Sequence, residues 1–127
     1  MYRAGGEIGR LWLLIHLPVA SRLRHLQNWH WSLTMVLHFL IQGRVQGVGF
    51  RWFVQREAGE LDLRGWVRNT EDGDVEVVAA GNQSELAELR ASLRRGPRGS
   101  RVDRLIEHYL DDSEAADLSS FRIDGAW

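Results

Sequence analysis

Hydrophobic and polar residues alternate with two different periods along residues 35–123, and each change of period marks a predicted element. Residues 35–42 form a short, mostly apolar run that glycines follow, which predicts a largely buried strand. Residues 43–49 contain three glycines and are predicted to form a loop. From residue 50 the apolar positions recur at helical spacing with charged residues between them, which predicts an amphipathic helix. These apolar positions are Phe50, Phe53, Val54, Ala58 and Leu61.

The rest of the pattern predicts a hairpin, a second helix and two further strands. Residues 63–69 and 75–80 return to a period of two, and the Asp72-Gly73 pair between them is a typical hairpin turn. Asn82, with Glu85 three residues later, indicates a capped helix start, and Gly96-Pro97 ends that helix. The remaining elements are a strand at 102–110, an acidic, serine-rich loop at 111–120 and a short strand at 121–123.

The order of these elements predicts the fold class. Two helices separated by a hairpin, with strands before and after them, form a split β-α-β arrangement. We therefore expect an α+β fold, the ferredoxin-like βαββαβ sandwich, with both helices on one face of a four- to five-stranded antiparallel sheet. No internal repeat or linker divides residues 35–127, which are expected to form one domain.

Residues 1–34 differ from that domain in charge. They carry four Arg and one Glu, whereas residues 35–127 carry twelve Arg and sixteen acids. The apolar run at 11–20 is too short to span a bilayer as a helix, and His16 and Pro18 interrupt its likeness to a secretory signal. We expect a poorly ordered or non-native N-terminal leader. A cleaved signal, and an ordered extra helix or membrane-surface segment, are the alternatives.

Composition removes several classes of chemistry. The chain has 127 residues and a formal net charge of -1, which argues against a strongly basic nucleic-acid binder. It has no Cys, which excludes disulfides, thiolate metal sites and cysteine nucleophiles. All 16 basic residues are Arg, so a Schiff-base lysine and the lysine of nucleotide-binding loops are excluded too. An anion must therefore be bound by Arg, His or backbone N–H groups.

The glycine-rich loop between the first strand and the first helix is the candidate anion site. A tight turn that enters a helix directs unpaired N–H groups to one side, and the helix N-terminus adds partial positive charge. Arg51 lies in the first helical turn, where its guanidinium can bind two oxygens of a phosphate. A plain strand-to-helix turn with a solvated Arg explains the pattern equally well. The loop residues are Gly43, Arg44, Val45, Gln46, Gly47, Val48, Gly49 and Phe50.

Asn69 is the second candidate, at the end of the strand in Gly65-Trp66-Val67-Arg68-Asn69-Thr70. In a split β-α-β fold this strand runs parallel to the first one, so their carboxyl ends share one edge of the sheet. An Asn amide offers both an acceptor and donors, and it can orient a water beside a bound phosphate. From this residue alone, the simpler interpretation is that Asn69 opens the hairpin turn.

Together, residues 43–51 and 65–70 closely resemble the acylphosphatase family, whose pattern is a Gly-Arg-Val-Gln-Gly-Val-x-Phe-Arg loop followed by Gly-Trp-Val-x-Asn. The resemblance implies metal-independent hydrolysis of the carboxyl–phosphate bond of small acyl phosphates such as acetyl phosphate. It implies that Arg51 holds the phosphoryl group, that the loop amides surround it, that Asn69 positions the attacking water and that Thr70 supports Asn69. It also implies no cofactor and no metal. We expect a cytoplasmic monomer with no nucleic-acid or membrane partner.

Two other functions remain open. One is a non-catalytic module of the same fold that binds carbamoyl phosphate or another acyl phosphate within a larger protein, although the chain ends at Trp127 and this favours a stand-alone hydrolase. The other is RNA binding, which the net negative charge of residues 35–127 disfavours. His38 and His108 are expected to be structural rather than metal ligands, and Trp52 and Trp66 to pack in the core or at the edge of the site.

Overall fold

The computed structural model describes residues 34–125, which belong to a compact unit that begins at Thr34. The alternatives for residues 1–34 concern a segment that, apart from Thr34, lies outside the described residues. The elements are β1 (Met35–Arg44), α3 (Phe50–Glu60), β2 (Arg64–Asn69), β3 (Val75–Gly81), α4 (Gln83–Arg95), β4 (Arg101–Leu110), the 3-10 helix η1 (Asp112–Asp117) and β5 (Phe121–Ile123).

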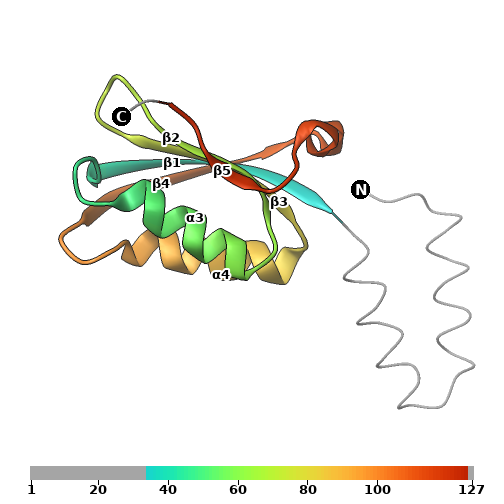
Figure 1. Cartoon of the computed structure of the whole chain (residues 1–127), viewed down its shortest axis with the longest axis horizontal. Helices are drawn as coiled ribbons and strands as arrows, with labels where there is room; N and C mark the ends of the chain where they lie inside the picture. Colours follow the sequence, from blue (N-terminus) through green and yellow to red (C-terminus); the bar gives the residue numbers. More distant parts are fainter. Residues whose placement is uncertain (1–33, 126–127) are drawn as a thin grey trace, which may run out of the picture. The chain divides into compact units, whose positions relative to one another are not determined.

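The five strands form one sheet in the order β4-β1-β3-β2-β5, and Figure 1 shows α3 and α4 together on one face of it. This arrangement confirms the ferredoxin-like α+β fold. The β1–β4, β1–β3 and β2–β3 pairs are antiparallel, but β2 and β5 are parallel, so the expectation of a fully antiparallel sheet is wrong at this edge. The chain crosses from one sheet edge to the other after β4, so β5 starts at the end of the sheet where β2 starts.

The main core lies between the sheet and the two helices, as the alternation in β1 predicts. Every second side chain of β1 from Leu37 to Ile41 faces the helices and is almost completely buried. The apolar stripes of both helices pack against these side chains. The helix residues in this core are Phe50, Phe53, Val54, Ala58, Leu86, Leu89 and Leu93. The start of α3, which follows the candidate loop, is therefore fixed by the burial of Phe50 in this core.

The acidic segment after β4 is more ordered than the sequence pattern indicates. Its first half forms η1, and the side chain of Ala115 packs with Val36, Val78 and Ala80 on the sheet face away from α3 and α4. The Arg64 guanidinium donates hydrogen bonds to the carbonyls at Ala115 and Leu118, 3.4 and 3.3 Å away. A serine-rich, charged pattern conceals this role because the apolar contacts come from Ala115 and the partly buried Leu118, which stand among charged and polar residues.

The two helices begin in different ways. At α4 the predicted capping box is confirmed: Asn82 Oδ1 accepts from the Glu85 N–H at 2.8 Å, and Glu85 Oε1 accepts from the Asn82 N–H at 3.1 Å. At α3 the N-cap residue is Gly49 in the left-handed conformation, and it provides no side-chain cap. The first N–H groups of α3 are therefore left open at the candidate site.

Candidate active site

The glycine-rich loop presents a run of backbone donors. Val45 is buried and fixes the start of the loop in the core, while Gly47 and Gly49 have φ angles of 75° and 76°. Two left-handed residues this close together produce the tightly curved backbone of an anion-binding nest. Within the described part of the chain, no protein acceptor meets the backbone N–H groups of residues 46–51. These donors are free to bind an anion.

Arg51 lies in the first turn of α3, next to these donors, and its side chain is half-buried. Among residues 34–125, no Asp or Glu forms an ion pair with Arg51, although seven other ion pairs are present there. A half-buried guanidinium without a carboxylate is an uncompensated positive charge beside a helix N-terminus. Together with the loop donors, it produces a locally electropositive site that suits a phosphoryl group.

Asn69 ends β2 at the same edge of the sheet. It pairs with Val75 of β3, and Val75 pairs in turn with Ile41 of β1, so these three residues form one row across the sheet. With strands spaced about 4.8 Å apart, the backbones of Ile41 and Asn69 lie roughly 10 Å from each other. Residues 65, 67 and 69 face the helix side, because β2 alternates and Val67 is in the main core. The predicted proximity of Asn69 to the end of β1 is confirmed.

Gln46 connects the loop to the hairpin turn, a contact that the sequence does not reveal. Its Nε2 donates to the carbonyl oxygens at Thr70 and Asp74, at 2.9 and 2.8 Å. Thr70 and Asp74 also bind each other, since the Thr70 N–H donates to the Asp74 carbonyl at 2.9 Å and the Asp74 N–H to Thr70 Oγ1 at 3.1 Å. The Thr70 hydroxyl thus stabilises the turn directly after Asn69.

A hollow of about 520 Å³ lies against Asn69. The end of β2, the hairpin turn and the residues after β5 line it together. The exposed side chains of Glu71 and Asp72 line this hollow together with the exposed guanidinium of Arg68, so charges of both signs border it.

The other singled-out residues lie away from this edge or differ from expectation. Trp52 is 69% exposed and is not a core residue, whereas Trp66 is half-buried beneath the Arg68 guanidinium at 5.2 Å. His38 forms a 2.6 Å hydrogen bond with Glu76 on the sheet face opposite the helices. Burial alone raises the pKa of Glu76, but hydrogen bonds and charges of His38 and Arg68 outweigh it and lower that pKa below 4.5.

In residues 34–125, no three His, Asp or Glu side chains are grouped so as to hold a metal ion. No helix in the same range has the length and apolar character needed to cross a membrane.

The fold and site together define a small α+β protein with a loop of open backbone donors at a helix start. The model of the acylphosphatase family matches residues 37–123, and this chain belongs to that family. It is 52% identical over 89 residues to an acylphosphatase of Koribacter versatilis, an alignment that covers 70% of this chain and 79% of the relative.

Solved structures agree with this assignment. The crystal structure of acylphosphatase from Bacillus subtilis matches with a TM-score of 0.68 and 35% identity, over 72% of this chain and 99% of that one. The crystal structure of HypF from T. kodakarensis matches with a TM-score of 0.63 and 31% identity, but only 12% of that chain is covered. The likeness therefore extends over almost a whole small acylphosphatase and over one part of a larger protein.

Proposed function

We propose that this protein hydrolyses small acyl phosphates to a carboxylate and inorganic phosphate, with Arg51 and Asn69 as its catalytic residues. The observation that carries the proposal is the run of open backbone donors at residues 46–51, beside an Arg51 side chain that no carboxylate of residues 34–125 neutralises. A dianionic phosphoryl group supplies the charge and the acceptors that this arrangement lacks.

Arg51 and the loop amides act on the phosphoryl oxygens. Phosphoryl transfer has a loose transition state in which negative charge lies on these oxygens, so fixed donors lower the barrier without forming a bond to the substrate. The leaving group is a carboxylate, which is stable as an anion and needs no proton from the enzyme. The work left to the protein is to hold the phosphoryl group and to place a water in line with the bond that breaks.

Asn69 orients the attacking water. Its half-buried amide lies on the helix-facing side at the sheet edge next to the loop. The amide oxygen can accept a hydrogen bond from the water while the amide nitrogen donates one to a phosphoryl oxygen. Gln46 holds the Thr70 peptide at 2.9 Å and so limits the movement of Asn69 relative to the loop. We propose that Thr70 supports this geometry through its hydroxyl rather than by contact with substrate.

Release of phosphate from acetyl phosphate, with and without a chelator, tests the activity and its independence of metal. We expect Arg51→Ala and Asn69→Ala each to lower kcat/KM by about 100-fold or more, as the loss of a transition-state donor does. Arg51→Lys should fail as well, because an ammonium cannot make the two-oxygen contact. Arg94→Ala, an exposed arginine on α4, is the matched control and should retain full activity.

The results separate hydrolase from binding module. Near-normal turnover by both alanine variants would refute the assignment of the site. Tight binding of acyl phosphate without turnover would favour the non-catalytic module. A monomeric state and a cytoplasmic location stay predictions, which sedimentation and localisation of the full chain would test.

A further inference from the structure

We propose that the hollow beside Trp52 binds the acyl part of the substrate and that it favours an aromatic acyl group. The inference rests on the function proposed above, and it concerns the acyl part of the substrate, which Arg51 does not contact. The hollow has a volume of about 540 Å³ and is separate from the one at Asn69. Its lining residues are Gly49, Trp52, Phe53, Gln55, Arg56 and Pro97.

The hollow begins at the phosphate loop itself. Gly49 is the last residue of that loop and also lines the hollow, and a Cβ added to it would meet no atom within 4 Å. Arg51 and Trp52 are consecutive, so their Cα atoms are about 3.8 Å apart. Because Gly49 belongs both to the loop and to the lining of the hollow, a benzoyl ring, attached only two bonds beyond the bridging oxygen, would lie next to the hollow when its phosphoryl group is bound at the loop.

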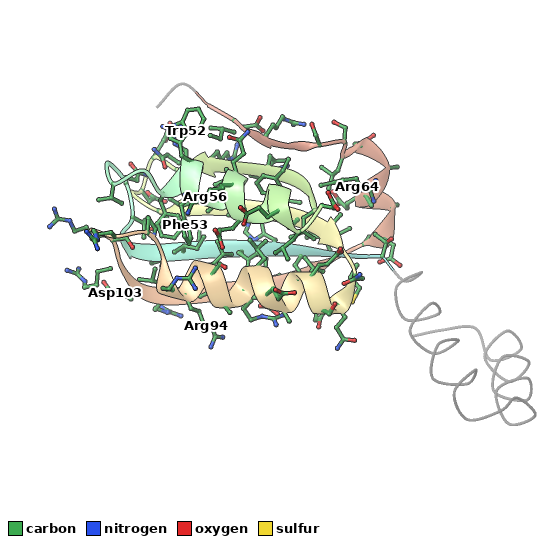
Figure 2. The ribbon with its side chains drawn as sticks, turned by 60° about the horizontal axis from the view of Figure 1, so that its bottom comes forward. Trp52, Phe53, Arg56, Arg64, Arg94 and Asp103 are labelled. Atoms are coloured by element: carbon green, nitrogen blue, oxygen red, sulfur yellow. The ribbon has the colours of Figure 1, made fainter. Side chains whose placement is uncertain are left out.

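The walls of the hollow are aromatic and held in place. Phe53 is almost completely buried and packs edge-on against Phe50, with ring centroids 5.9 Å apart. The guanidinium groups of Arg56 and Arg95 each lie 5.7 Å from the Phe53 centroid. In Figure 2, Trp52, Phe53 and Arg56 extend along α3 at the end of the molecule that carries the loop. The Arg56 guanidinium and the Phe53 ring therefore line a surface on which a second aromatic ring can pack.

Trp52 places a large, exposed aromatic side chain in the lining of this hollow. It is 69% exposed in the first turn of an otherwise well-packed helix, and an exposed indole beside a concave, partly apolar surface is typical of a ligand-binding residue. Tyr109 is the other large exposed hydrophobic residue among residues 34–125, at 67%, and it lies on β4 outside the lining of this hollow. Tyr109 therefore offers a matched control for the loss of an exposed aromatic ring.

The test compares benzoyl phosphate with acetyl phosphate in steady-state assays of the full chain. In Trp52→Ala we expect kcat/KM for benzoyl phosphate to fall by about 10-fold relative to that for acetyl phosphate, mainly through a higher KM, because one ring–ring contact is lost. Trp52→Phe keeps a ring and should retain most of the preference. Tyr109→Ala should leave both substrates and their ratio unchanged.

Each outcome has one meaning. A benzoyl-to-acetyl ratio that is the same in wild type and Trp52→Ala, with both proteins active, would overturn the acyl subsite and leave the hydrolase assignment intact. An equal loss on both substrates would overturn it too, since it would place Trp52 in the support of the phosphate loop. A wild-type protein that hydrolyses neither substrate would refute the proposed function, and the subsite with it. Circular dichroism of each variant establishes that it is folded.

Discussion

Gln46→Leu breaks the contact between the glycine-rich loop and the hairpin turn but leaves Arg51 and Asn69 in place. The Gln46 amide donates at 2.9 Å to the Thr70 carbonyl and at 2.8 Å to the Asp74 carbonyl, and these bonds connect the phosphate loop to the hairpin turn. Leucine has a similar volume but no donor. The substitution therefore removes the connection while the loop backbone and both catalytic side chains stay present.

The structure sets the expected size of the effect. Two neutral hydrogen bonds contribute about 1 kcal/mol each to stability, so Gln46→Leu should lower the free energy of unfolding by about 2 kcal/mol. For a domain of this size that corresponds to a fall in Tm of about 10 °C. A displacement of Asn69 by about 1 Å relative to the bound phosphate should lower kcat by about 10- to 100-fold, with a smaller change in KM.

Urea titration and acetyl phosphate kinetics measure the two effects on the same protein. Gln42→Leu is the matched control, because Gln42 also reaches the turn but only through a 3.3 Å contact with the Asp74 carboxylate. It should lose less than about 1 kcal/mol and keep its kcat. If Gln46→Leu loses stability yet keeps wild-type kcat, the Gln46 contact does not position Asn69 and the reasoning is wrong.

Three further predictions concern the rest of the chain. Because the pKa of Glu76 is lowered in the fold, its contribution to stability is present above pH 4.5 and is lost as pH falls through the lowered value. Glu76→Gln should therefore reduce the loss of the free energy of unfolding at acidic pH, as urea titrations measure it. An unchanged loss would contradict the direction of the pKa shift. Gly65→Ala should lower the free energy of unfolding by more than about 3 kcal/mol, because the new Cβ would clash with the Val78 carbonyl oxygen. Gly59→Ala in α3 meets open space and should raise the free energy of unfolding by about 0.5–1 kcal/mol. Deleting residues 1–34 should leave acetyl phosphate turnover intact, and loss of folding in the shortened chain would contradict the proposed domain boundary at residue 35.

The elements that the sequence predicts well are those with local causes. The Asp72-Gly73 turn and the Asn82–Glu85 capping box depend on residues a few positions apart, and the structure has both where the pattern indicates them. The approach of Asn69 to the end of β1 is a longer-range prediction, and it succeeds because the order of strands and helices permits few topologies. The strand-to-helix loop is predicted for the same reason as the turn, because its three glycines fall within seven residues of sequence.

The parts that sequence reasoning misses depend on contacts between distant segments. Gln46 reads as one more loop residue, since nothing local indicates that its side chain reaches a turn 24 residues away. The parallel β2–β5 pair follows from a crossover that a short strand of three residues does not reveal. The sequence predicts that Trp52 packs in the core or at the edge of the site, and its exposure in the structure excludes the core.

The division of the site between two structural supports explains which substitutions should affect activity and stability together. Arg51 is attached to a helix whose start is fixed by the buried Phe50, and Asn69 to a strand paired along its length with β3. Loss of either side chain removes a catalytic contact but little packing, so it should lower kcat with almost no change in the free energy of unfolding. Gln46 belongs to neither support and connects the two, so its loss should lower both quantities. If Gln46→Leu lowers both kcat and the free energy of unfolding, while Arg51→Ala and Asn69→Ala lower kcat alone, Gln46 acts by positioning and the other two residues act in the chemical step.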